Sequence, residues 1–122
     1  MLAKTGNSEI TIPPETDEIL EEMAKDLKYE KKATLVREIA RENLDHKALD
    51  YYDHTVRNRE LRKKGIKKAR FFMTWPSKDL REAILESAEK SRTFFSDWLE
   101  DLLIQKANEY KESKNVVKSR NR

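Results

Sequence analysis

Two short stretches of the chain alternate apolar and polar residues, and each stretch ends at proline. Residues 9–14 read EITIPP and residues 70–76 read RFFMTWP. Alternation is the pattern of a half-buried β-strand, and proline ends a strand because it has no N–H to donate to a neighbouring strand. The pattern therefore predicts two short strands. Their inner faces would carry Ile10, Ile12, Phe71, Met73 and Trp75.

Apolar residues at helical spacing follow each predicted strand. After the first strand they fall within residues 19–27 and 35–44, and after the second within residues 80–88 and 95–107. Spacings of three and four residues place such side chains on one face of an amphipathic helix. The order strand, helix, turn, helix is therefore predicted twice in one chain.

The segments outside these two halves are predicted to be a linker and a tail. Residues 47–68 continue a helical pattern until Gly65, a residue type that commonly ends a helix. Residues 109–122 are polar and basic, which favours a frayed tail. We therefore divide the chain into residues 1–46, a helical basic linker, residues 69–108, and a basic polar tail. The predicted fold is mainly α with short β-strands, in which the two strands of one chain pair antiparallel as a ribbon on a helical base.

Charge is distributed unevenly along the chain. The net charge of +3 combines residues 1–56, with 8 basic and 13 acidic side chains, and residues 57–122, with 18 basic and 10 acidic. Residues 57–70 contain eight lysines and arginines but only one acidic residue, Glu60. A block this basic is typical of a surface that contacts phosphate, and the alternative is a solvated helix end.

Several classes of protein are disfavoured by the composition. Without cysteine the chain has no thiol for a disulfide or a metal site. His46 and His54 lie eight residues apart, which is not the i, i+4 spacing of a helical zinc site, and a glycine-rich phosphate loop is absent. We therefore expect neither an enzyme, nor a cofactor, nor a metal site. The sequence has neither an apolar run of membrane-spanning length nor a signal peptide, and it predicts a cytoplasmic protein without a membrane partner.

Residues 7–46 and 69–108 resemble the ribbon-helix-helix regulators of the Arc/MetJ/CopG type. The Met-Thr-Trp-Pro stretch of residues 73–76 is similar to the strand end of Arc-type repressors, and Leu-Val-Arg-Glu-Ile-Ala at residues 35–40 is similar to the second helix of CopG-type proteins. The resemblance implies two tandem ribbon-helix-helix units, as in certain regulators of archaeal viruses. It also implies sequence-specific binding to double-stranded DNA through a ribbon in the major groove, with a possible homo-oligomer on the DNA.

The resemblance also implies which residues would contact DNA. Outward strand residues would contact bases, and the start of the second helix of each unit would hold a phosphate. The implied base contacts are Arg70, Phe72, Thr74, Asn7, Glu9 and Thr11. The implied phosphate contacts are Lys31, Lys32, Thr34, Arg92 and Thr93, to which the basic block adds Lys67 and Lys68. Glu9 departs from the family's pattern, because a carboxylate can accept from cytosine but repels phosphate.

A second hypothesis is that the chain is an antitoxin-like or helical module that mainly binds a protein partner. The two hypotheses predict different surfaces. A DNA reader should gather its cations near one face, whereas a partner-binding module should expose an apolar surface. The sequence leaves the operator, and the choice between activation and repression, open.

Overall fold

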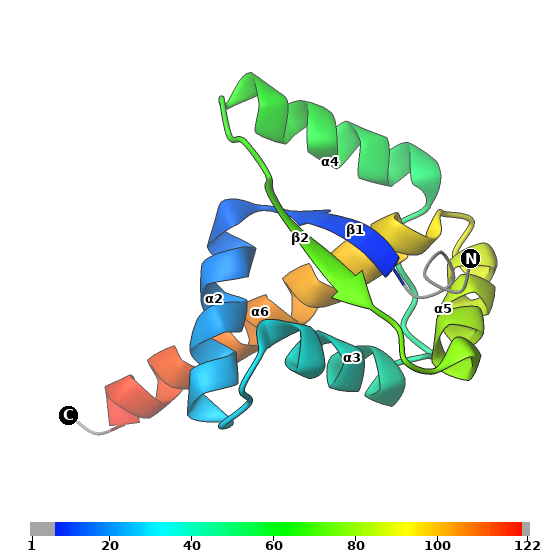
Figure 1. Ribbon diagram of the computed structural model, residues 1–122. Helices are drawn as coiled ribbons and strands as arrows, with labels where there is room; N and C mark the ends of the chain where they lie inside the picture. The colour runs from blue at the N-terminus through cyan, green and yellow to red at the C-terminus, as the bar shows by residue number, and fades with distance from the viewer. Residues whose placement is uncertain (1–6, 121–122) are drawn as a thin grey trace.

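The computed structural model describes residues 7–120 of the chain, and the side chains of residues 8–114. In this range the chain forms one two-stranded sheet and five helices (Figure 1). In chain order the elements are β1 (Asn7–Ile12), α2 (Pro14–Asp26), α3 (Lys32–Glu42), α4 (Tyr51–Lys63), β2 (Ala69–Thr74), α5 (Lys78–Lys90) and α6 (Phe95–Arg120).

The strands β1 and β2 pair antiparallel with each other within the chain, as we expected. Asn7 pairs with Thr74 at one end of the ribbon, and Ile12 pairs with Ala69 at the other end. Because side chains alternate along a strand, this register gives the ribbon one inner and one outer face. The inner face is apolar, and its buried residues are Ile10, Ile12, Met73 and the adjoining Trp75.

The inner face of the ribbon packs on α6, which runs behind it through the middle of the molecule (Figure 1). Four side chains of α6 are fully buried there: Trp98, Leu99, Leu102 and Leu103. The helices α2, α3 and α5 add buried apolar residues to the same cluster. One core therefore joins residues from both halves of the chain.

The predicted division into two tandem ribbon-helix-helix units is wrong. The described residues form five helices and a single ribbon, which does not fit two such units. The reason is that the single ribbon and the helices of both halves share one apolar core, so neither half is a unit of its own. The linker adds α4, a fifth helix that lies above the ribbon in Figure 1 and belongs to neither repeated pattern.

Local signals fix several helix ends. Pro14 occupies the first position of α2, where its missing N–H costs nothing. The side chain of Ser77 accepts a hydrogen bond from the backbone N–H of Leu80 at 3.4 Å, which caps α5. Gly65 follows the end of α4 with a φ of 74°, a left-handed conformation that favours glycine. Gly65 therefore stops the linker helix, as predicted.

The segment predicted to be a frayed tail belongs to α6, which continues to Arg120. On its way it lies against α2 and forms polar contacts with it. The Tyr110 hydroxyl donates to Asp26, and the Lys111 ammonium lies 2.6 Å from Glu15. The ammonium of Lys114 lies 2.9 Å from Glu22. Paired charges along α2 thus order residues that look like a free tail in the sequence.

Candidate nucleic-acid interface

The outer face of the ribbon is open to solvent. In Figure 1, α6 lies behind the ribbon and α2 and α3 lie beside and below it, so that no helix crosses in front of the ribbon. Glu9, Arg70, Phe72 and Thr74 are exposed on this face, and Thr11 is half-buried. Asn7 belongs to β1, but its side chain lies outside the described residues. The five described residues predicted to contact bases therefore share one face.

Glu9 and Arg70 lie close together on this face although they belong to different strands. A guanidinium nitrogen of Arg70 lies 3.6 Å from a carboxylate oxygen of Glu9. Both side chains are well exposed, so this ion pair is worth little in stability. Its consequence is electrostatic, because Arg70 offsets the negative charge that Glu9 would otherwise bring toward a phosphate backbone.

Phe72 is the largest apolar side chain on the outer face, and 73% of its surface is exposed. Phe72 is not part of the core, and the fully buried residue of β2 is its neighbour Met73. An exposed aromatic on a ribbon can pack against a thymine methyl group or another apolar surface. Phe72 is therefore available to contact another molecule and contributes little to the core.

The basic block of the sequence divides into partly buried cations that bind carboxylates of α6 and cations that are exposed. Arg57 binds Asp101 at 2.8 Å, and Lys68 binds Glu100 at 2.7 Å. Lys68 thus helps to attach the segment between α4 and β2 to α6, although it was predicted to contact phosphate. The exposed members of the block are Arg59, Arg62, Lys63, Lys64, Lys67 and Arg70.

The start of α3 carries one exposed and one engaged lysine. Lys31 is exposed, whereas Lys32 forms an ion pair with Asp17 and lies over the ring of Phe71 at 4.7 Å. The hydroxyl of Thr34 accepts a hydrogen bond from Arg37 at 3.2 Å. Arg37 also donates to the carbonyl of Thr74, the last residue of β2.

Arg37 therefore ties the start of α3 to the end of the ribbon, a role that the sequence did not reveal. Its position on the polar side of an amphipathic helix is indistinguishable from that of a solvated arginine. The role of Arg37 could be recognised only once the packing of α3 against the end of β2 was known.

The helix α6 begins at Phe95, two residues after Thr93. The Thr93 hydroxyl is buried without a hydrogen-bond partner among the described residues. Arg92 is exposed and has a left-handed φ of 58°. Its carbonyl accepts a hydrogen bond from the backbone N–H of Tyr51. The first residue of α4 therefore lies beside the predicted phosphate site at Arg92 and Thr93.

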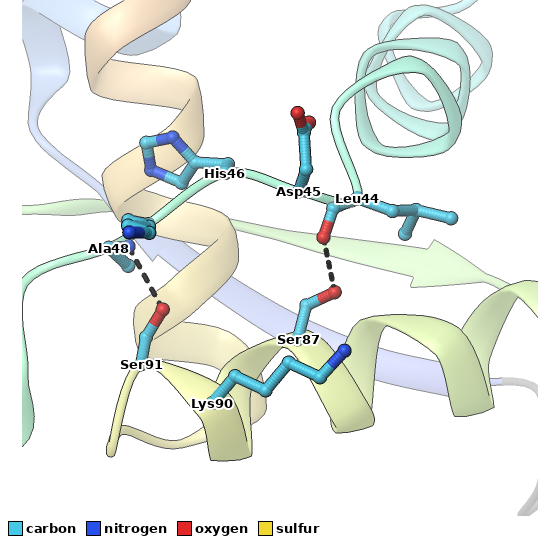
Figure 2. Close-up of a pocket in the computed structure, with 8 residues that line it drawn as sticks. Leu44, Asp45, His46, Ala48, Ser87, Lys90 and Ser91 are labelled. Atoms are coloured by element: carbon cyan, nitrogen blue, oxygen red, sulfur yellow. Dashed lines mark hydrogen bonds between the residues drawn. The ribbon is translucent and has the colours of Figure 1, made fainter.

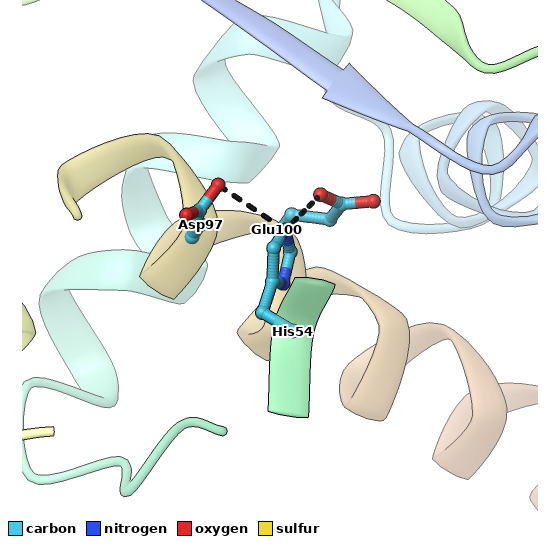
Figure 3. Close-up of side chains that lie close together, drawn as sticks. All are labelled: His54, Asp97 and Glu100. Carbon is cyan, nitrogen blue, oxygen red and sulfur yellow. Dashed lines mark ion pairs between the residues drawn. The ribbon is translucent and has the colours of Figure 1, made fainter. Parts of the chain in front are cut away.

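A polar seam attaches α4 to α6 (Figure 3). His54 is the one residue of α4 that is buried, and its Nε2 lies 3.1 Å from Asp97 and 3.2 Å from Glu100. Its Nδ1 lies 3.1 Å from the guanidinium of Arg57. This cluster could not be recognised in the sequence, because its carboxylates lie more than forty residues from His54 along the chain.

The two carboxylates change the protonation of His54. Asp97, and after it Glu100, raises the pKa of His54 from 6.5 to about 9, although burial acts in the opposite direction. A nearby negative charge favours the imidazolium form of the ring. At neutral pH the seam therefore holds a positive ring between two carboxylates.

A second linkage joins the segment before α4 to α5 and surrounds a cavity of about 470 Å³ (Figure 2). The Ser87 hydroxyl donates to the carbonyl of Leu44 at 2.5 Å, and the Ser91 hydroxyl accepts from the backbone N–H of Ala48 at 3.0 Å. His46 lines the cavity, but its Nε2 is directed to Asp101 of α6 at 2.9 Å. The side chains of Ser87, Ser91 and His46 are thus engaged in bonds that hold the chain together.

Comparison with known proteins adds no relative. No protein-family model, curated protein or solved structure matches this chain. The resemblance to ribbon-helix-helix regulators therefore stays a prediction from the residues. In the described part of the chain, each helix is too short or too polar to cross a membrane.

Proposed function

We propose that this protein is a sequence-specific double-stranded DNA-binding transcriptional regulator that inserts the β1–β2 ribbon into the major groove. The observation that carries the proposal is the open outer face of the ribbon. It presents hydrogen-bonding side chains and Phe72 to solvent, and an apolar core holds its other face. A rigid strand pair that exposes such groups suits the reading of base edges.

The dimensions of the ribbon support this use. Each strand has six residues, so the ribbon is about 20 Å long at roughly 3.3 Å per residue. Its strands lie about 5 Å apart, and a major groove about 12 Å wide admits a two-stranded ribbon. Arg70 is the outer residue able to donate two hydrogen bonds to one guanine, while Thr11 and Thr74 can each bond a base or touch a thymine methyl.

The exposed cations of the basic block support phosphate contact beside the groove. Arg59, Arg62 and Lys63 belong to the outer side of α4, since His54 and Arg57 face α6. Lys64 and Lys67 continue the positive charge toward the first residues of β2. Such side chains release counterions on binding and make affinity depend strongly on salt without reading sequence.

A second candidate function is docking of a protein partner, and one observation favours it. Tyr51 and Phe94 are 54% and 63% exposed and contact each other edge to face at 5.3 Å between ring centroids. Tyr52 is 73% exposed on the first turn of α4. Exposed aromatic groups are enriched at protein interfaces, so this aromatic cluster is the place where such a partner would bind.

Selection from random DNA duplexes tests the proposal. We expect enrichment of a defined site and a loss of affinity with salt. Each neutralised phosphate contributes about −0.9 to the slope of log K against log salt concentration. Alanine at both Arg59 and Arg62 should flatten that slope, whereas Tyr52→Ser, on the same helix, should leave it unchanged. A wild-type protein that enriches no site and binds all duplexes equally would contradict the proposal.

A further inference from the structure

Three side chains that can bind a metal ion converge in the seam between α4 and α6. His54 comes from α4, and Asp97 and Glu100 come from successive turns of α6 (Figure 3). One ligand atom from each lies within 4.8 Å of the other two. His54 and Glu100 are almost fully buried, and Asp97 is partly exposed, so the cluster has one side open to solvent.

The spacing of these atoms matches the edges of a coordination sphere. Zinc binds imidazole nitrogen and carboxylate oxygen at about 2.0–2.2 Å, which places neighbouring ligands of a tetrahedral ion roughly 3.3–3.5 Å apart. The same bond lengths give roughly 3.0 Å between neighbouring ligands of an octahedral ion. The observed separations from Nε2 are 3.1 Å to Asp97 and 3.2 Å to Glu100. Two of the three separations therefore match a coordination sphere, and the third, between the oxygens of Asp97 and Glu100, is at most 4.8 Å.

The Nε2 atom of His54 provides an independent indication of a ligand. It is buried and lies 3.1 and 3.2 Å from the two carboxylates, but it is not aligned with either oxygen for a hydrogen bond. Buried polar atoms are normally satisfied, and each exception calls for a physical reason such as an ion. Coordination would satisfy this nitrogen through its lone pair.

We propose that His54, Asp97 and Glu100 bind one divalent first-row transition metal ion, with zinc as the representative case. Two carboxylates and a neutral imidazole offset the charge of such an ion, and water would complete its coordination. Lys68 now donates to the oxygen of Glu100 that faces His54 at 2.8 Å and lies 2.7 Å from the other oxygen. The ion would take the first oxygen, and Lys68 can stay on the second as an outer-sphere partner. The ion would clamp α4 to α6.

The metal has three competitors in the seam. The first is the proton, because only the neutral ring can coordinate. The second is Lys68, which donates to the Glu100 oxygen that faces His54. The third is Arg57, which lies 3.1 Å from Nδ1 and must move aside, because Nδ1 carries the proton of the ring when Nε2 binds the ion. Arg57 keeps its bond to Asp101 in that state.

Imidazole together with carboxylate selects the class of ion. Magnesium and calcium prefer oxygen ligands alone, whereas zinc, cobalt and nickel accept an imidazole nitrogen. The site should therefore ignore magnesium at concentrations that saturate it with zinc. Its effect on the protein is independent of DNA binding, since the ion joins two helices of the same chain.

Metal titration of chelator-treated full-length protein tests the proposal. We expect one equivalent of Zn²⁺ by calorimetry, and one equivalent of Co²⁺ with a visible absorption band that reports ligation by the protein. At a hundredfold excess over Kd, Zn²⁺ should raise Tm by about 10 °C. His54→Gln, Asp97→Asn and Glu100→Gln should each weaken Co²⁺ binding at least tenfold. His46→Gln, which replaces the other buried histidine, is the matched control and should bind as the wild type does.

The outcomes separate a metal site from a purely ionic seam. Asp97→Asn is the mildest variant, because Asp97 is partly exposed, and its circular dichroism should confirm that the helices remain. Wild-type protein that binds Zn²⁺ no better than His54→Gln overturns the proposal. Equal responses to Zn²⁺ and Mg²⁺, or loss of the site in His46→Gln alone, overturn it as well.

Discussion

The helices α4 and α5 have the same length, 13 residues, but different forces hold them in the molecule. α5 buries Leu80, Ile84, Ser87 and Ala88 against the core. α4 buries His54 alone, and its contacts with α6 are ionic. An apolar interface depends on area removed from water, whereas an ionic interface depends on charge state and salt.

The difference divides the molecule into two parts. The body is the ribbon with α2, α3, α5 and α6, and the attachment is α4, whose contact with the body depends on charge. The ribbon and the helices α2, α3, α5 and α6 share one apolar cluster and should unfold together. The helix α4 should separate from that body when its charges change, while the ribbon remains folded. The proposed base-reading groups stand on the body. Three of the six exposed cations of the basic block, Arg59, Arg62 and Lys63, stand on the attachment.

Removing a core aromatic should have the largest effect. Trp75 is 4% exposed, contacts Phe95 edge to face and donates to the Ser8 hydroxyl at 3.0 Å. Trp75→Ala should lower the free energy of unfolding by about 3–5 kcal/mol. Tyr52→Ala, which removes an exposed aromatic of α4, should change it by less than about 0.5 kcal/mol. Urea unfolding followed by circular dichroism measures both changes. Equal losses of free energy in the two variants would contradict the assignment of Trp75 to the core and Tyr52 to the exposed surface of the attachment.

Raising the pH should loosen the attachment and leave the body intact. The folded-state pKa of His54 is about 9, above the ordinary value of 6.5. The stabilisation by the imidazolium is therefore complete below pH 6.5 and is lost as the pH rises through 9. The shift corresponds to about 3 kcal/mol, because each pKa unit is worth about 1.4 kcal/mol.

Hydrogen exchange in the presence of a chelator can follow this loss in the two helices separately. After correction for the intrinsic rate, the amides of α4 should lose protection between pH 7 and pH 9.5, while those of α5 keep theirs. Glu100→Gln removes one of the two carboxylates that raise the pKa and should reduce the pH dependence. A uniform loss of protection across the molecule would mean that α4 and the core unfold as one unit.

The sequence predicted those parts of the fold that depend on periodicity. Alternation located Ile10, Ile12, Met73 and Trp75 on the buried face, because the side-chain period of a strand is two. The repeated order of elements was a poorer guide to the number of units. Local pattern does not determine which strand pairs with which.

The polar seam could not be predicted because it joins distant residues of ordinary type. His54 and Glu100 each look like a solvated residue on a charged helix, and their burial follows only from the packing of α4 on α6. Lys68 shows the same limit in the candidate interface. Within a basic block it is indistinguishable from Lys67, yet Lys68 binds Glu100 and Lys67 is exposed.

Under the proposed function, residues of the body and residues near the attachment should contribute differently to DNA binding. Arg70 stands on β2, whose position the core fixes, whereas Lys67 lies in the segment after α4. Arg70→Ala should reduce discrimination between a selected site and random DNA by about 1–3 kcal/mol, the value of a bidentate contact to guanine. Lys67→Ala should weaken binding to both DNAs equally and reduce the salt slope by about one phosphate.

Binding titrations on both duplexes at several salt concentrations measure the two effects together. Discrimination depends on donors held in a fixed direction, and a strand backed by buried side chains provides that direction. A phosphate contact needs only charge within reach, so a less firmly held segment suffices for it. If Arg70→Ala weakens binding to both duplexes equally, Arg70 contacts phosphate and the outer face of the ribbon is not the reading surface. If Lys67→Ala instead loses discrimination, the attachment reads the sequence and our division of roles between the two regions is reversed.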